Sequence, residues 1–360
     1  MTNEGARGPE RPTPFERILN ALHLPYPVAC FLLAILAGGP GFILIEYAYS
    51  RDWDMTLRLV LSQPNGATWE GAIVSALFSL VDFLVFTGIA QLRNRLVAAK
   101  EYLIGLCPDG EVTYDRAFRL MPSWWPAVIA FGLESVSAIS ASVSGLVDAQ
   151  GLPHFALLEV LRFLMTFGII TFVWIYATGL RGLHEIGKQP VRLKSYHEDL
   201  LLGTRPIGQI SLRFAFSFFV ILVLVLVANT LLPDPWTFVI VAVFSIIAIT
   251  MFFLPLNSIH RRMAEVKGTE TKSVRARFNR LMEDAEPSDP SQSTEPFARL
   301  DRRLRELAGL QVLDMEIRET ASIRAWPFDT RILGQLTVII LSVLAALIVR
   351  LVIVALPVLR

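Results

Sequence analysis

Long blocks of apolar residues, separated by shorter charged segments, dominate the pattern of this chain. Seven blocks come near the roughly 20 apolar residues that a helix needs to cross about 30 Å of hydrocarbon. They lie at residues 27–49, 71–91, 124–147, 155–180, 214–232, 237–256 and 332–356. The third block is the weakest, because it is rich in Ser and Ala and contains Glu134. The pattern predicts an all-α integral membrane protein with about seven transmembrane helices.

Residues 257–331 form a long, highly charged segment whose two ends run directly into apolar blocks. Apolar residues recur in it at helical spacing on both sides of a proline-rich stretch at 284–296. They are Ile259, Met263, Val266, Val274, Phe278 and Leu281 before it, and Leu300, Leu304, Leu307, Leu310, Leu313 and Ile317 after it. Because prolines end a helix, we expect an antiparallel helical hairpin with a flexible tip at 284–296. The hairpin is either a solvated connector or, through its apolar stripes, a surface for a homo-oligomer or a cytoplasmic protein.

Basic residues concentrate in alternate connections between the apolar blocks. Loops 92–123 and 181–213 and the hairpin carry most of them, whereas the turns at 149–154 and 233–236 have no Lys or Arg. The positive-inside rule then places the N-terminal segment 1–26 and the hairpin in the cytoplasm. The last helix and a short external C-terminus follow at 332–360. We therefore expect a protein integral to the plasma (inner) membrane, with residues 27–256 forming a six-helix region.

Composition supports this class and excludes others. Hydrophobic residues make up 53% of the chain, and a net charge of +1 does not favour nucleic-acid binding. Cys30 lies in an apolar block and Cys107 in a charged loop, so a disulfide framework is not expected. No motif predicts a metal or a cofactor. The lipid bilayer is the one partner that the composition itself predicts.

Two carboxylates lie near the middle of their predicted spans. Asp82 is in the second span and Glu134 in the third. A charged carboxylate exposed to lipid at that depth costs on the order of 3 kcal/mol, so both should face the bundle interior, contact water or be protonated. They are candidates for a proton or cation path. Alternatively, Glu134 is neutral and hydrogen-bonded to a serine or to Asp82.

The first span and the outer helix ends contain further candidates. Gly38, Gly39, Pro40 and Gly41 interrupt the first span about halfway, and we expect a break or a kink there. Such a break either lines an ion site or lets another helix pack closely. An outer cluster of ionisable residues comprises Glu46, Asp148, His154, Glu159 and Arg162. Glu159 and Arg162 are three residues apart and can form an ion pair.

Enzyme motifs are incomplete in this sequence. His184 and Glu185 lack the second histidine of a zinc-protease helix, and the run from Ser142 to Gly145 lacks a histidine placed to act as a base. We expect that the protein is not an enzyme, although the sequence does not exclude an intramembrane enzyme. Two hypotheses remain: a channel or transporter for protons or small cations, and a membrane-anchored sensor or scaffold whose hairpin docks a partner or oligomerises.

Overall fold

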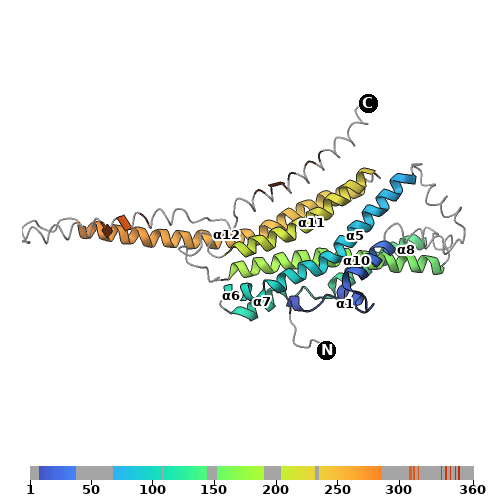
Figure 1. Ribbon diagram of the computed structural model, residues 1–360, viewed down its shortest axis with the longest axis horizontal. Coiled ribbons are helices and arrows are strands. Elements are labelled where there is room, and N and C mark those ends of the chain that lie inside the picture. The colour runs from blue at the N-terminus through green and yellow to red at the C-terminus, as the bar shows by residue number, and fades with distance from the viewer. Residues whose placement is uncertain are drawn as a thin grey trace, which may run out of the picture.

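The computed structural model of the chain describes residues 8–37, 68–107, 109–143, 152–189, 204–231 and 235–285, together with single positions between 308 and 348. Most of these residues are helical, and no strand occurs among them. The elements are η1 (Gly8–Glu10), α1 (Pro14–Asn20), α2 (Tyr26–Ala37), α5 (Thr68–Ala98), α6 (Lys100–Leu106), α7 (Gly110–Phe118), α8 (Trp125–Val143), α10 (Leu152–Lys188), α11 (Arg205–Leu231) and α12 (Pro235–Ala285). Figure 1 shows the long helices side by side in an elongated bundle.

Four helices are long and apolar enough to cross a membrane: Ser75–Ala98, Phe155–Lys188, Pro206–Ala228 and Val241–Arg280. They contain most of the predicted second, fourth, fifth and sixth spans. The first and third spans correspond to shorter apolar helices, Tyr26–Ala37 and Trp125–Ser140. The predicted seventh span and the return arm of the hairpin lie outside the described residues, apart from single helical positions such as Val312 and Leu341. The membrane-helix class is therefore confirmed, whereas the count of seven stays a prediction.

The directions of the helices follow from the pairs that touch. Phe86 lies beside Gly168 and Leu96 beside Gly179, so α5 and α10 run in the same direction. By contrast, Phe214 lies beside Gly179 and the Phe218 ring stacks on that of Phe172, so α11 runs against α10. Helices that cross a membrane one after another run in alternate directions. The second and fourth crossings are then parallel to each other, and the fifth is antiparallel to both.

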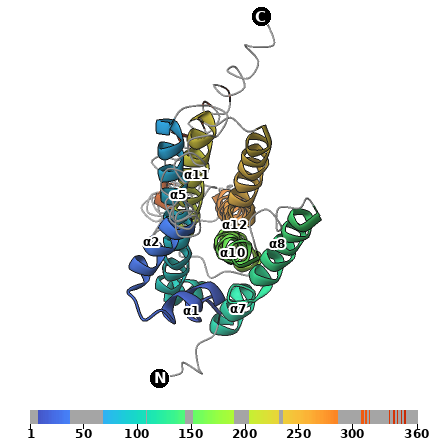
Figure 2. The same ribbon diagram turned by 90° about the vertical axis from the view of Figure 1, so that its right-hand side faces the viewer.

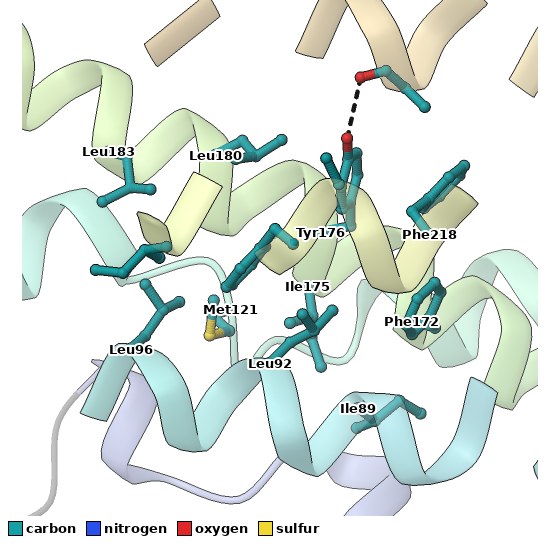
Figure 3. Close-up of a cluster of buried hydrophobic side chains, with 14 of the residues drawn as sticks. Ile89, Leu92, Leu96, Met121, Phe172, Ile175, Tyr176, Leu180, Leu183 and Phe218 are labelled. Atoms are coloured by element: carbon teal, nitrogen blue, oxygen red, sulfur yellow. Dashed lines mark hydrogen bonds between the residues drawn. The ribbon is translucent and has the colours of Figure 1, made fainter. Parts of the chain in front are cut away.

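The core lies where α5, α10, α11 and α12 meet, and its side chains are aliphatic and aromatic (Figure 3). Tyr176 is central, because its ring lies 4.5 Å from that of Phe218 and its hydroxyl donates to the Ala248 carbonyl at 3.0 Å. Lipid is as apolar as these side chains, so close packing and hydrogen bonds between helices, more than removal from water, hold such a bundle together. Small residues such as Gly88, beside the Phe172 ring, permit that approach.

Helix α12 is continuous across the predicted boundary at residues 256 and 257. It contains Pro255, which removes one backbone donor from its interior. Next to this position, His184 of α10 donates through Nδ1 to the Leu254 carbonyl at 2.9 Å, and Ser258 Oγ donates to the Pro255 carbonyl at 2.7 Å. The first arm of the predicted hairpin is thus an extension of a membrane-length helix, and Figure 1 shows it projecting beyond the bundle.

The predicted loop 92–123 is also helical over most of its length. It contains the end of α5, then α6 and α7, which return toward the bundle. Tyr114 and Phe118 of α7 are fully buried, and the Tyr114 hydroxyl donates to the Leu96 carbonyl at 3.1 Å. This part of the chain is a packed helical layer at one end of the bundle.

Candidate functional site

Asp82 lies inside the bundle on α5. The residue is 3% exposed, and Val81, Val85 and Phe86, close to it along the helix, are also buried. Within the described part of the chain, its carboxylate has no hydrogen bond and no ion pair. An ionised carboxylate without a partner in such surroundings costs several kcal/mol. The group must therefore hold a proton, or take water or a cation as its partner.

Glu134 lies on α8 and has partners on α10. Thr166 Oγ1 donates to Glu134 Oε1 at 2.5 Å, and Arg162 Nε lies 4.0 Å from Glu134 Oε2. A serine or Asp82 was the predicted partner of a neutral Glu134, and the structure places a threonine there. Asp82 has no comparable partners among the described residues.

Arg162 joins Glu134 to part of the predicted outer cluster. Its Nη1 lies 2.9 Å from Glu159 Oε1, which confirms the predicted pairing, and its Nη2 donates to Ser137 Oγ at 3.1 Å. We call Glu134, Ser137, Glu159, Arg162 and Thr166 the α8–α10 polar cluster. Thr166 was missed by the sequence analysis, although its spacing of four and seven residues from Arg162 and Glu159 places all three on one helix face.

Glu134 and α5, the helix that carries Asp82, lie on opposite faces of α10. Glu134 contacts Thr166, whereas Phe86, one turn from Asp82 on α5, lies beside Gly168. Positions 166 and 168 are two residues apart, which is about 200° around a helix. Figure 2 shows the same separation, with α8 on one side of α10 and α5 on the other. Asp82 and Glu134 therefore do not form a pair.

A second buried charge lies where the N-terminal segment meets α5. Glu16 of α1 is 2% exposed, and its Oε1 accepts from Arg93 Nε at 3.0 Å. Thr13 Oγ1 accepts from the Glu16 backbone N–H at 3.3 Å, and the Thr13 backbone N–H donates to Glu16 Oε2 at 2.8 Å. This capping box orients the carboxylate toward Arg93. The Thr-x-x-Glu spacing in the sequence is the signal that could have predicted this capping box.

A second set of ion pairs, outside the apolar core, attaches the same N-terminal segment to the bundle. Lys100 Nζ lies 2.7 Å from Glu10 Oε1 and 3.3 Å from Glu111 Oε1. The hydrogen bond that Lys100 donates to Glu10, together with the one that it donates to Glu111, raises the pKa of Lys100 above its usual range. Residues 8–20 are thus attached to the bundle by two sets of ion pairs, and they are not a free N-terminal tail.

Several predicted candidates cannot be placed. Gly38, Gly39, Pro40, Gly41, Glu46 and Asp148 lie outside the described residues, and so does the side chain of His154, whose backbone is in the first turn of α10. Among the residues that are described, no group of three or more His, Cys, Asp and Glu side chains is arranged to hold a metal ion.

Comparisons of the chain with protein-family models, curated proteins and solved structures found no match. Any proposal on function must therefore come from the residues themselves.

Proposed function

We propose that the protein moves protons or small cations across a membrane, with Asp82 as the site that binds and releases them. The observation that carries this proposal is the burial of the Asp82 carboxyl group without a polar partner among the described residues. Ionisable groups inside membrane helices are costly, and those without a structural partner are typical of ion and proton pathways. Glu134 has Thr166 and Arg162 nearby, which supports a positioning role for it.

The proposed topology has seven crossings, a cytoplasmic N-terminus, a cytoplasmic helical hairpin at 257–331 and an external C-terminus. The predicted second and fourth spans, α5 and α10, run in the same direction and the predicted fifth, α11, runs against them, which supports serial crossing; the basic connections support the orientation. In this arrangement the Glu16–Arg93 pair is on the cytoplasmic side of Asp82.

Ion flux into liposomes that contain the purified protein tests the proposal. Asp82→Asn is expected to abolish the flux, because an amide cannot exchange a proton or bind a cation electrostatically. Thr171→Val is the matched control: Thr171 is also buried in the bundle, at 1% exposure, but its hydroxyl donates to the Phe167 carbonyl of its own helix. Equal flux in wild-type, Asp82→Asn and empty liposomes, under proton, sodium and potassium gradients, would refute the proposal.

The variant Glu134→Gln distinguishes the role of Glu134 from that of Asp82. Since Glu134 lies on the other face of α10, we expect this variant to keep the ion selectivity of the wild type and to lose only part of the rate. A complete loss of flux in Glu134→Gln would instead place Glu134 in the conduction path.

A second candidate function, a membrane-anchored sensor or scaffold, is favoured by the continuity of α12. This helix joins the bundle to a segment in which Ile259, Met263 and Val274 are buried while Arg275 and Arg277 are exposed. Native mass spectrometry of the full chain, purified with its associated proteins, tests this function. A monomer without partners would remove its support.

A further inference from the structure

One face of α5 links the unpartnered carboxylate to the buried ion pair. Asp82, Phe86, Ile89 and Arg93 recur at spacings of four, three and four residues, and eleven residues return a helix to within about 20° of the same direction. Helix α1 covers this face between its two charged ends, since Phe15 contacts Phe86 while Glu16 pairs with Arg93. An aromatic contact therefore separates Asp82 from the ion pair.

We propose that α1 is a gate that closes access to Asp82 from the side of the Glu16–Arg93 pair. This inference rests on the proposed function, because a gate needs a path to close. Phe15 is the closing side chain, and the Glu16–Arg93 pair is the latch that holds it.

The closing contact consists of three aromatic rings. The Phe15 ring centroid lies 5.2 Å from that of Phe86 on α5 and 5.5 Å from that of Phe167 on α10. Gly168 makes room for this arrangement, because a Cβ atom there would touch Phe86 and would lie 3.1 Å from Phe15 Cε2. Phe15 is 1% exposed, so the rings fill the space between α5 and α10 and exclude water.

The latch is built from polar contacts beside these rings. Besides its bond to Glu16, Arg93 donates through Nη1 to the carbonyls of Pro9 and Glu10, at 3.3 and 3.5 Å. The guanidinium thus binds η1 and α1 together, and loss of the Glu16 carboxylate would weaken both attachments. An ion pair is a suitable latch because a change in one of its charges can release it without remodelling the rest of the bundle. An apolar contact cannot be released in this way.

The connection between α1 and α2 is suited to movement. Helix α1 has only seven residues, and His23 in the following turn has a positive φ of 56°. Leu22 and Leu24 in this turn are exposed, so the turn has little packing to hold it. Movement of α1 about this turn would withdraw Phe15 while α2 stays against α5.

A native cysteine reports the state of this gate. Cys30 is fully buried on α2, one turn after Tyr26, whose hydroxyl donates to the Phe86 carbonyl at 2.7 Å. One residue further, the Phe31 ring contacts that of Phe83, so Cys30 lies at the depth of the residues that follow Asp82. A thiol reagent that enters from the side of Arg93 must pass α1 to reach it.

The experiment measures Cys30 labelling by a membrane-impermeant maleimide in full-length protein carrying Cys107→Ser, reconstituted in liposomes. Phe15→Ala and Glu16→Gln are expected to label about tenfold faster, which corresponds to ~1.4 kcal/mol of lost closure free energy. Glu111→Gln is the matched control, because it removes a carboxylate that pairs with Lys100 at an exposed position and leaves α1 untouched. Unchanged labelling in Phe15→Ala and Glu16→Gln, with wild-type elution and thermal unfolding, would overturn the gate.

A reversible cross-link provides a second test that does not depend on the folding of those variants. In a background of Cys30→Ser and Cys107→Ser, the pair Glu16→Cys and Arg93→Cys is joined by a short, reducible thiol cross-linker. Flux that stops on cross-linking and returns on reduction supports the gate. Flux that depends on Asp82 but is unchanged by the cross-link overturns the gate and still supports the proposed function. Faster Cys30 labelling without flux in any variant shows that α1 moves, but it refutes ion transport and overturns the gate with it.

Discussion

Gly168 offers a direct test of the packing between α1, α5 and α10. In Gly168→Ala, the new Cβ would touch Phe86 Cε1 and would lie 2.7 Å from Phe86 Cδ1 and 3.1 Å from Phe15 Cε2. Carbon atoms at optimal separation are about 3.5–4.0 Å apart, so at least one ring must move. Overpacking of this kind costs about 1–3 kcal/mol, and the better helix propensity of Ala returns roughly 0.5–1 kcal/mol. The difference between the midpoints of these two ranges is a net loss of about 1 kcal/mol.

The assay is thermal unfolding in detergent, followed by tryptophan fluorescence at one fixed scan rate, since membrane proteins often unfold irreversibly. Gly132→Ala on α8 is the matched control, because a Cβ there would meet nothing within 4 Å. It should raise the Tm slightly, whereas Gly168→Ala should lower it by several degrees. Adding Phe86→Leu to Gly168→Ala should recover part of the loss, because the smaller side chain makes room for the methyl group. A Gly168→Ala protein as stable as the Gly132→Ala protein would refute the reasoning.

Three further predictions concern polar groups. Asp82→Asn should keep the Tm or raise it, by up to about 1 kcal/mol of stability, because it removes a buried carboxyl group that has no described partner; a clear fall in Tm would contradict this. Tyr176→Phe should cost about 0.5–1.5 kcal/mol in the same assay through loss of the bond to Ala248, and an unchanged Tm would contradict it. Burial, with Asp109 nearby, raises the pKa of the Cys107 thiol. The stabilisation from burying the protonated Cys107 thiol is therefore fully present below the pKa that this thiol has in the unfolded chain. It is lost as the pH rises through the pKa that the thiol has in the folded protein. Iodoacetamide should accordingly modify Cys107 more slowly than a free thiol at about pH 8, and an equal rate would contradict the raised pKa.

The sequence predicted those features that depend on neighbours along the chain. Apolar blocks near 20 residues identified the membrane helices, and a spacing of three residues predicted the Glu159–Arg162 pair. The same reasoning placed a boundary at 256 and 257, because charged residues begin there. This boundary marks where the predicted membrane span meets the predicted cytoplasmic hairpin, and α12 continues through it past Pro255, since a change of solvent does not interrupt backbone hydrogen bonds.

Features that depend on which helices touch could not be predicted in this way. Glu16 and Arg93 are 77 residues apart in the chain, and no local pattern relates them. The depth of Asp82 and Glu134 was read from their positions within spans, but the face of α10 that each one approaches depends on where α5 and α8 pack. The mixed charges of the N-terminal segment did not predict its packing, and a single aromatic residue such as Phe15 carries no periodic signal.

The continuity of α12 gives the protein a mechanical lever. From Leu256 to Ala285 the helix extends for about 44 Å at 1.5 Å per residue. Pro255, where one backbone hydrogen bond is missing, is the natural point of bending, and His184 of α10 contacts the helix there. A tilt of about 5° at this point would displace Ala285 by about 4 Å, so a small rotation within the bundle becomes a displacement of atomic size at the far end of the helix.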